Sequence, residues 1–225
     1  MRQLIVELVK LVRNKNFLNI WIIFTLMNGS YVSFGTILNL IFEPFGYTST
    51  ETSMLGATCI LSGLISSIIF PIIIDRYHWF LRSLKIIVFG AFISSVLVYG
   101  TIPHKNLLPS LISIGLLGFF LIPTMSVVYA FATEVTYPSS EALFGSLLQA
   151  TSGIFGTAVA YGISILIRHL GPSSALLAYV SFFLICCAVA VYVKEDLRRL
   201  KAGQEVIVER GSASNAHHAQ ADQSD

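Results

Sequence analysis

Residues 106–133 read NLLPSLISIGLLGFFLIPTMSVVYAFAT, a run of 28 residues without one charged side chain. A helix needs about 20 apolar residues to cross the hydrocarbon core of a bilayer, so this run is long enough. The rest of the chain has the same character, since 55% of its 225 residues are hydrophobic and 12% are charged. A soluble domain carries about 25% charged residues. The composition therefore predicts a polytopic membrane protein and argues against a soluble enzyme or a nucleic-acid-binding protein.

Five further uncharged windows flank this run. The six windows cover 17–42, 52–74, 86–103, 106–133, 142–167 and 170–193. Each is long enough to span as a helix, whereas a strand of a transmembrane barrel alternates apolar and polar residues over about 10 positions. We therefore predict an all-α fold with six transmembrane helices.

Lysine and arginine are distributed unevenly between the two sides of this predicted bundle. Twelve of them fall on the side of both termini, and two, Lys105 and Arg168, fall on the other side. An excess of Lys and Arg marks the cytoplasmic side of a membrane protein. We therefore expect both termini in the cytoplasm, and the even number of spans agrees, since it places both termini on the same side.

The segments outside the predicted bundle have a different composition. Residues 1–16 place polar side chains at helical spacing and are predicted to form an amphipathic helix on the cytoplasmic membrane surface. Residues 17–195 form the predicted six-helix bundle. Residues 196–225 are rich in small and polar side chains without periodicity, so we expect a disordered cytoplasmic tail.

A faint internal repeat relates the two halves of the bundle. Residues 47–51 read YTSTE after the first span, and residues 137–141 read YPSSE after the fourth span. Both share the pattern Tyr-x-Ser-x-Glu and fall on opposite sides of the membrane, as two three-helix units inserted in opposite senses would place them. The pattern favours a 3+3 inverted repeat.

Catalytic chemistry has no sequence signal in this chain. Metalloprotease, P-loop, hydrolase-elbow and Cys-x-x-Cys motifs are absent, and no Asp, Glu, Lys or Arg lies in the middle of a span. An ionisable residue there is the usual marker of an intramembrane active site. We therefore expect no enzymatic activity, no cofactor and no metal site.

Polar side chains inside the spans are the candidates for binding a solute. The first span carries Asn28 and Tyr31 near Gly29-Ser30, a pair expected to weaken the helix locally. These polar groups either line a water-filled path or bond neighbouring helices. Tyr129 lies in the fourth span, where Pro123 is expected to kink the helix. We predict that a cavity at mid-membrane depth is lined by Asn28, Tyr31, Tyr129 and Gln149.

Gln149 belongs to a stripe of small residues on the fifth span. Gly145, Gly153, Gly156 and Ala160 recur with it at spacings of three and four, which lets two helices approach closely. We expect this stripe, and Gln149 with it, to face protein or a cavity rather than lipid.

The loops on the side of the termini carry opposite charges. Asp75, Arg76 and Arg82 lie between spans two and three, and Glu134 and Glu141 lie between spans four and five. We predict that these five residues form a cytoplasmic gate, in which an arginine pairs with a glutamate when that side closes. The alternative is solvated loop charge, worth about 0 to 1 kcal/mol per pair.

Two stretches resemble a known family. Residues 71–76, PIIIDR, followed by Arg82, resemble the loop pattern G-x-x-x-D-R/K-x-G-x-R/K-R/K of the major facilitator superfamily, with Pro71 and His78 in place of the glycines. More specific are FATEVTYPSSE at residues 131–141, the later pairs at 147–148 and 155–156, and DLRR at 196–199. Together they resemble the C-terminal six-helix half of the feline leukaemia virus subgroup C receptor-related family.

The resemblance implies transport of a small solute by alternating access, with choline, ethanolamine or haem as the solute and the plasma membrane as the location. It also implies that Tyr31 faces the ligand and that a second six-helix half completes the carrier, either another copy or a separate N-terminal half. The family pattern S-A-Q-x-F-G corresponds to residues 151–156, TSGIFG, so Gly153 replaces its glutamine. The alternatives are a non-transporting interaction or receptor subunit and an intramembrane enzyme.

Overall fold

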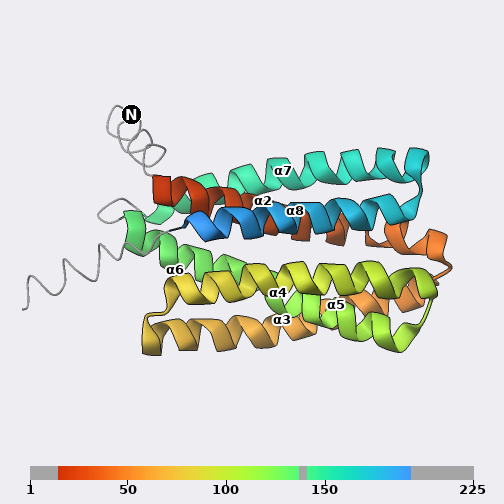
Figure 1. Ribbon diagram of the computed structural model, residues 1–225, viewed down its shortest axis with the longest axis horizontal. Coiled ribbons are helices and arrows are strands. Elements are labelled where there is room, and N and C mark those ends of the chain that lie inside the picture. Colours follow the sequence, from red (N-terminus) through yellow and green to blue (C-terminus); the bar gives the residue numbers. More distant parts are fainter. Residues whose placement is uncertain (1–14, 137–140, 194–225) are drawn as a thin grey trace, which may run out of the picture.

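The computed structural model describes residues 15–136 and 141–193, and within these ranges six helical segments are long and apolar enough to cross a membrane. They lie side by side in one bundle (Figure 1). Their bounds are α2 (Lys15–Phe42), α3 (Ser49–Tyr77), α4 (Phe80–Thr101), α5 (Leu107–Leu121) continued by α6 (Thr124–Thr136), α7 (Glu141–Leu170) and α8 (Pro172–Tyr192). The predicted all-α membrane fold with six spans is confirmed, while most of the predicted interfacial helix (1–14) and the predicted tail (196–225) lie outside the described residues.

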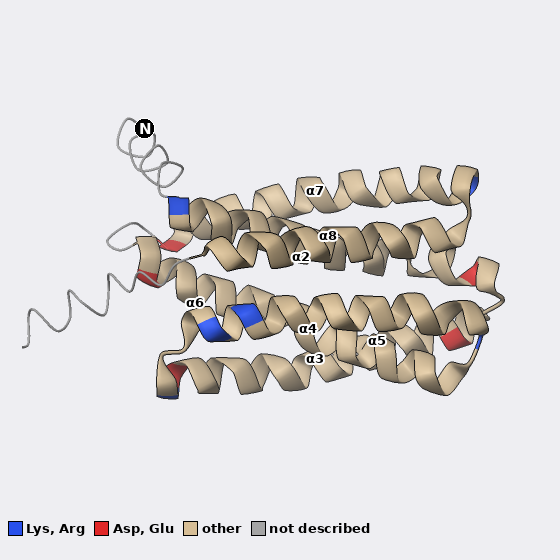
Figure 2. Ribbon diagram, in the orientation of Figure 1, with Lys and Arg blue, Asp and Glu red and all other residues tan. Residues whose placement is uncertain are grey.

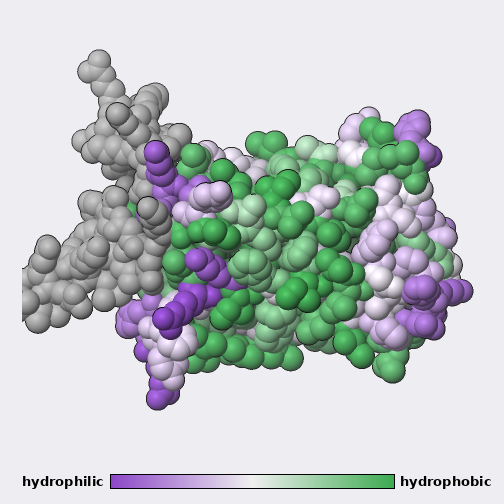
Figure 3. Space-filling model, viewed as in Figure 1, coloured by the Kyte–Doolittle hydropathy of each residue, from purple (hydrophilic) through white to green (hydrophobic). Residues whose placement is uncertain are grey.

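Charged residues gather at the two ends of the bundle, and an apolar surface covers its middle (Figures 2 and 3). One end, called here the Lys15 end, holds the first turns of α2, α4 and α7 and the last turns of α3, α6 and α8. The other, called the Lys105 end, holds Glu43, Glu51, Lys105 and Arg168. The apolar belt is the surface that a bilayer requires.

Proline divides the fourth span, as the sequence predicts. α5 ends at Leu121 and α6 begins at Thr124, with a turn at Ile122 and Pro123. The proline ring carries no N–H to donate to the preceding turn. The predicted kink at Pro123 is confirmed.

The first span differs from the prediction. α2 runs through Gly29 and Ser30 as a regular helix, and its non-helical residue is Ile37 (φ −112°, ψ 18°). Gly29 is buried against α7, where an added Cβ would lie 2.6 Å from the Phe155 ring and 3.0 Å from the Ser152 carbonyl oxygen. This packing supports the helix at the glycine, so the expected weak point at Gly29-Ser30 is wrong.

Helix packing shows the 3+3 inverted repeat directly. The units are α2–α3–α4 and α5/α6–α7–α8. The first helix of each unit packs chiefly on the second helix of the other, α2 on α7 and α5 on α3, while the two third helices, α4 and α8, pack together. Both crossings are close, because an added Cβ at Gly156 would lie 2.9 Å from the Gly29 carbonyl oxygen and one at Gly118 would overlap the Cys59 carbonyl. The two units are therefore related by a pseudo-twofold arrangement.

Candidate functional site

Tyr31 lies in an open groove between α2 and α3. These two helices touch little in this region, and Gly35 and Gly56 leave space where larger side chains would close it. The groove is lined by Tyr31, Val32, Phe34, Gly35, Thr36, Leu38, Gly56, Cys59 and Ile60. Among these described lining residues it therefore offers the partly buried Tyr31 ring, the buried Phe34 ring, apolar walls and no charged side chain.

The hydroxyl group of the groove's threonine is already used. Thr36 Oγ1 donates to the Val32 carbonyl oxygen at 2.7 Å, within its own helix. A ligand in the groove meets chiefly the ring and hydroxyl of Tyr31 and hydrocarbon. Such a surface suits an amine with methyl or methylene groups, since a cation is attracted to the face of an aromatic ring.

Asn28 lies on the side of α2 that faces α7. Its Nδ2 donates to Ser152 Oγ at 2.9 Å. The Ser152 hydroxyl in turn donates to the Gln149 carbonyl oxygen at 3.0 Å. This arrangement matches the alternative in which polar groups of the first span bond a neighbouring helix.

Tyr129 is packed between α2 and α7. Its hydroxyl donates to the Gly145 carbonyl oxygen at 3.0 Å, and its ring meets the Phe24 ring edge to face at 5.8 Å. An added Cβ at Gly145 would lie 2.9 Å from the Tyr129 ring. Tyr129 therefore joins α6 to α7 and does not line the Tyr31 groove.

Gln149 is exposed on α7, whereas Gly145, Gly156 and Ala160 of the same stripe are buried. The structure thus does not bring the four candidate residues into one pocket within the described ranges. Only Tyr31 lines the α2–α3 groove, and the solute-binding role of the four residues stays a prediction.

The predicted gate residues lie at one end of the bundle. Asp75 and Arg76 end α3, Arg82 is in the first turn of α4, Glu134 is buried on α6, and Glu141 is exposed at the start of α7. All are at the Lys15 end, where Figure 2 shows charges of both signs. The Arg82 guanidinium lies 4.9 Å from the Trp79 ring centroid. Pairing between these arginines and glutamates stays a prediction.

A second groove contains a residue that the sequence analysis did not select. Trp21 Nε1 donates to Thr151 Oγ1 at 2.8 Å, and Thr25 Oγ1 lies 3.3 Å from the same oxygen. The groove is lined by Leu18, Trp21, Ile22, Thr25, Leu26 and Thr151. Trp21, Thr25 and Asn28 follow one another at spacings of four and three, so the helical periodicity of the first span was the available signal.

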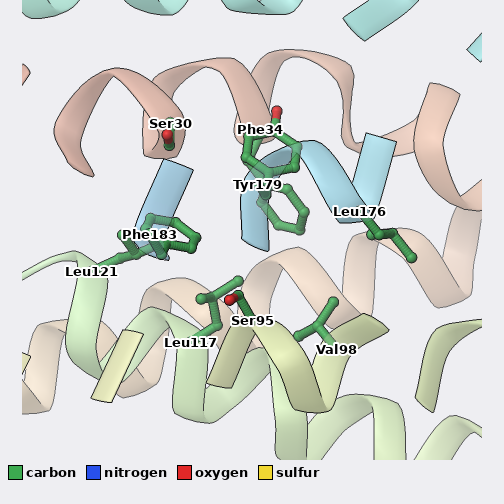
Figure 4. Close-up of a pocket in the computed structure, with 9 residues that line it drawn as sticks. All are labelled: Ser30, Phe34, Ser95, Val98, Leu117, Leu121, Leu176, Tyr179 and Phe183. Carbon is green, nitrogen blue, oxygen red and sulfur yellow. The ribbon is translucent and has the colours of Figure 1, made fainter. Parts of the chain in front are cut away.

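A small interior pocket lies on the other side of α2 (Figure 4). It is lined by Ser30, Phe34, Ser95, Val98, Leu117, Leu121, Leu176, Tyr179 and Phe183. Ser30 Oγ is fully buried and has no hydrogen-bond partner among the described residues. Phe34 lines both this pocket and the Tyr31 groove, and its ring meets Tyr179 edge to face at 5.5 Å. Phe34 therefore separates the two spaces.

Comparison with known proteins identifies relatives among membrane transporters. The chain is 27% identical over 215 residues to a choline/ethanolamine transporter of Danio rerio, flvcr2a, covering 95% of this chain and 45% of that protein. It is 24% identical over 202 residues to the human choline/ethanolamine transporter FLVCR2, covering 89% of this chain and 38% of that protein. It is 26% identical over 194 residues to an uncharacterized MFS-type transporter of Caenorhabditis elegans, covering 86% of this chain and 33% of that protein.

No family model matches the chain. The chain spans less than half the length of the curated relatives named above. The resemblance indicated by the motifs is confirmed, since two of these relatives are choline/ethanolamine transporters named FLVCR2 or flvcr2a, the third is an MFS-type transporter, and the similarity covers about nine-tenths of this chain. Together with the inverted repeat, this similarity makes the bundle comparable to one six-helix half of that fold.

Proposed function

We propose that the chain takes part in carrying a small solute across a membrane by alternating access, and that the solute is an amine of the choline or ethanolamine type. The observation that carries this proposal is the Tyr31 groove, in which the partly buried Tyr31 ring lies beside the buried Phe34 ring among apolar walls, with no charged side chain among the described lining residues. A quaternary ammonium on a tyrosine ring gains about 0.5 to 2 kcal/mol, depending on how far water is excluded. The names of the relatives agree with this solute class.

An amine fits the groove better than haem does, although the resemblance implies both. Haem iron in proteins takes axial ligands such as His, Met, Cys or Tyr. Among the lining residues, Cys59 is 5% exposed and Tyr31 is the other candidate ligand. A cation of a few heavy atoms needs no such ligand, and the short α2–α3 groove has room for it.

We further propose that a second six-helix half, another copy or a separate chain, covers the face of α2 and α7. Small or polar residues are exposed there, namely Gly35 and Thr36 on α2 and Gln149, Ala150, Thr157, Ala158 and Gly162 on α7, beside large apolar ones such as Val32, Ile154 and Tyr161. Most exposed residues of α4 and α8 are large and apolar, among them Ile86, Phe89, Ile93, Leu184, Ile185 and Val191. Small residues mark helix contacts inside membranes and large apolar ones suit lipid, so α4 and α8 form the outer side.

The Lys15 end is assigned to the cytoplasm in this proposal, and the plasma membrane is the proposed location. The assignment rests on the excess of Lys and Arg at that end, which sets orientation during insertion. Labelling of single cysteines introduced at Lys15 and Lys105 with an impermeant maleimide on intact cells tests it. Only the Lys105 position should react from outside.

Radiolabelled choline flux into proteoliposomes tests the transport function. The full chain is reconstituted alone and with a candidate N-terminal half, and wild type is compared with Tyr31→Ala and Tyr31→Phe. We expect Tyr31→Ala to lower uptake about 2- to 30-fold and Tyr31→Phe to keep most of it, because the ring face is retained. The matched control is Tyr99→Ala on the outer face of α4, where the tyrosine is 41% exposed and lies outside the groove.

A second candidate function is a non-transporting membrane interaction subunit. The bonds Asn28–Ser152 and Tyr129–Gly145 favour it, because they use two of the predicted ligand residues to hold helices together. Absence of flux for choline, ethanolamine and haem, with the protein shown to be folded and paired, would favour this function over transport.

A further inference from the structure

The outward side of α4 changes from basic to apolar along its length. Arg82, Lys85, Ile86, Phe89 and Ile93 follow one another at spacings of three, one, three and four, so they lie on one face of the helix. Arg82 is exposed and Lys85 is partly exposed, while the exposed fractions of the three apolar side chains are 55%, 42% and 59%. We call these five residues the α4 stripe. Its basic part lies near the Lys15 end, where Figure 2 shows basic residues in the first turns of α4.

Aromatic side chains frame the basic part of the α4 stripe. The Arg82 guanidinium carbon lies 4.9 Å from the Trp79 ring centroid, and the Trp79 and Tyr77 rings are stacked at 5.0 Å. Tyr77 and Trp79 are 52% and 43% exposed. Trp and Tyr are enriched at the level of lipid headgroups. These rings therefore place Arg82 and Lys85 at headgroup depth, with Ile86 and the following residues in the acyl region.

The two basic side chains of the α4 stripe have no acidic partner among the described residues. Within residues 15–136 and 141–193, neither Arg82 nor Lys85 forms an ion pair. The neighbouring end of α3 contributes one acid, Asp75, and one base, Arg76, which cancel. A cationic surface that continues directly into exposed hydrocarbon matches a ligand with an anionic head and an apolar tail.

We propose that Arg82 and Lys85 bind the phosphate group of an anionic phospholipid in the leaflet at the Lys15 end. The acyl chains of this lipid lie along Ile86, Phe89 and Ile93. Arg supplies paired N–H donors for phosphate oxygens and Lys supplies a point charge, which is a common division of roles in phosphate binding. A soluble anion would use the two cations and leave the apolar part of the stripe without a role.

Native mass spectrometry of the full chain, titrated in detergent with phosphatidylglycerol or phosphatidylcholine, tests this proposal. We expect phosphatidylglycerol to be retained preferentially by the wild type. Each basic residue near an anionic lipid surface contributes about a fivefold gain in binding, so Lys85→Gln should weaken retention about fivefold and the Arg82→Gln/Lys85→Gln pair about 30-fold. Lys85→Arg should retain the lipid as the wild type does.

The matched control is Lys105→Gln/Arg168→Gln, which removes two cations from the opposite end. Equal loss of lipid in this control would show a response to net charge and would overturn the assignment to α4. Unchanged retention in the Arg82→Gln/Lys85→Gln variant, or equal retention of phosphatidylcholine, would also overturn it. If glycerol phosphate competes at the same concentration as the lipid, the site recognises phosphate alone, and the proposed binding of a phospholipid is wrong. If the double variant does not fold, Lys85→Gln and Lys85→Arg decide, because Lys85 is partly exposed.

Discussion

Asn28 Nδ2 donates a hydrogen bond of 2.9 Å to Ser152 Oγ and thereby joins α2 to α7 in the apolar middle of the bundle. The two helices also meet backbone to backbone one residue further along α2, at Gly29 and Gly156. A polar bond beside a close glycine contact is a common way to hold helices together in lipid. The most polar span is thus tied to the helix with the stripe of small residues.

Replacement of Asn28 by Ala should destabilise the bundle. Hydrogen bonds between membrane helices contribute about 0.6 kcal/mol on average and at most about 1.7 kcal/mol, so the loss should fall in that range. Thermal unfolding in detergent measures the effect, and Asn39→Ala is the control, since Asn39 is exposed on the same helix. If Asn28→Ala leaves stability unchanged and abolishes amine binding, Asn28 has the ligand role that the sequence suggests.

Two glycines of α7 should respond to alanine in opposite directions. An added Cβ at Gly156 would lie 2.9 Å from the Gly29 carbonyl oxygen, and one at Gly162 would have no atom within 4 Å. Gly156→Ala should therefore destabilise the protein by about 1 to 3 kcal/mol through overpacking. Gly162→Ala should stabilise it by up to about 1 kcal/mol, because alanine favours the helix. Equal Tm values for the two variants would contradict the close α2–α7 contact.

The spans could be predicted from the sequence because backbone N–H and C=O groups in hydrocarbon must be bonded within the protein, and a long uncharged segment does this by forming a helix. Uncharged windows and Pro123 are both local signals. The uncharged windows predicted the observed helices, and Pro123 predicted the observed break between α5 and α6. The role of Asn28 or Tyr129 depends on which helix stands opposite, and periodicity gives a face of a helix without naming its neighbour. Gly29 shows the same limit, since its packing against α7 overrides its weak helix propensity.

Replacement by alanine should change the stability differently at two buried serines of α2. Ser30 Oγ has no hydrogen-bond partner among the described residues, whereas Ser33 Oγ lies 2.9 Å from the Tyr179 hydroxyl. Ser30→Ala removes an unsatisfied polar group and should leave stability unchanged or raise it by up to about 1 kcal/mol. Ser33→Ala should lower it by about 1 to 3 kcal/mol, because it takes a partner from a buried hydroxyl. Thermal unfolding of the two variants side by side gives the comparison, and a loss in Ser30→Ala would show that its hydroxyl is satisfied.

Gly153 should accept a glutamine. The family pattern places glutamine at this position, and an added Cβ at Gly153 meets no atom within 4 Å. If the chain transports an amine as proposed, the Gly153→Gln variant should fold normally and bind choline several-fold more tightly, because the amide adds a polar contact on the face of α7. Equilibrium binding of radiolabelled choline measures this, with Gly162→Gln on the same helix as control. Equal gains in both variants would exclude a specific role for the position.

Charge reversal tests the predicted gate at the Lys15 end. Arg82→Glu and Glu141→Arg should each lower amine uptake, and the double variant should recover much of it if the two side chains pair in one state of the transport cycle. The exposed Glu141 is the first partner to test, because reversing the buried Glu134 would put a cation in place of a carboxylate in the core. A surface ion pair is worth about 0 to 1 kcal/mol, which limits the change for each single variant to about fivefold.

Lys85→Gln separates this gate from the lipid site, because Lys85 belongs to the α4 stripe and not to the predicted gate. If the double variant shows no more uptake than the single variants, the predicted pairing of Arg82 with Glu141 is wrong, whatever the effect of Lys85→Gln on lipid retention.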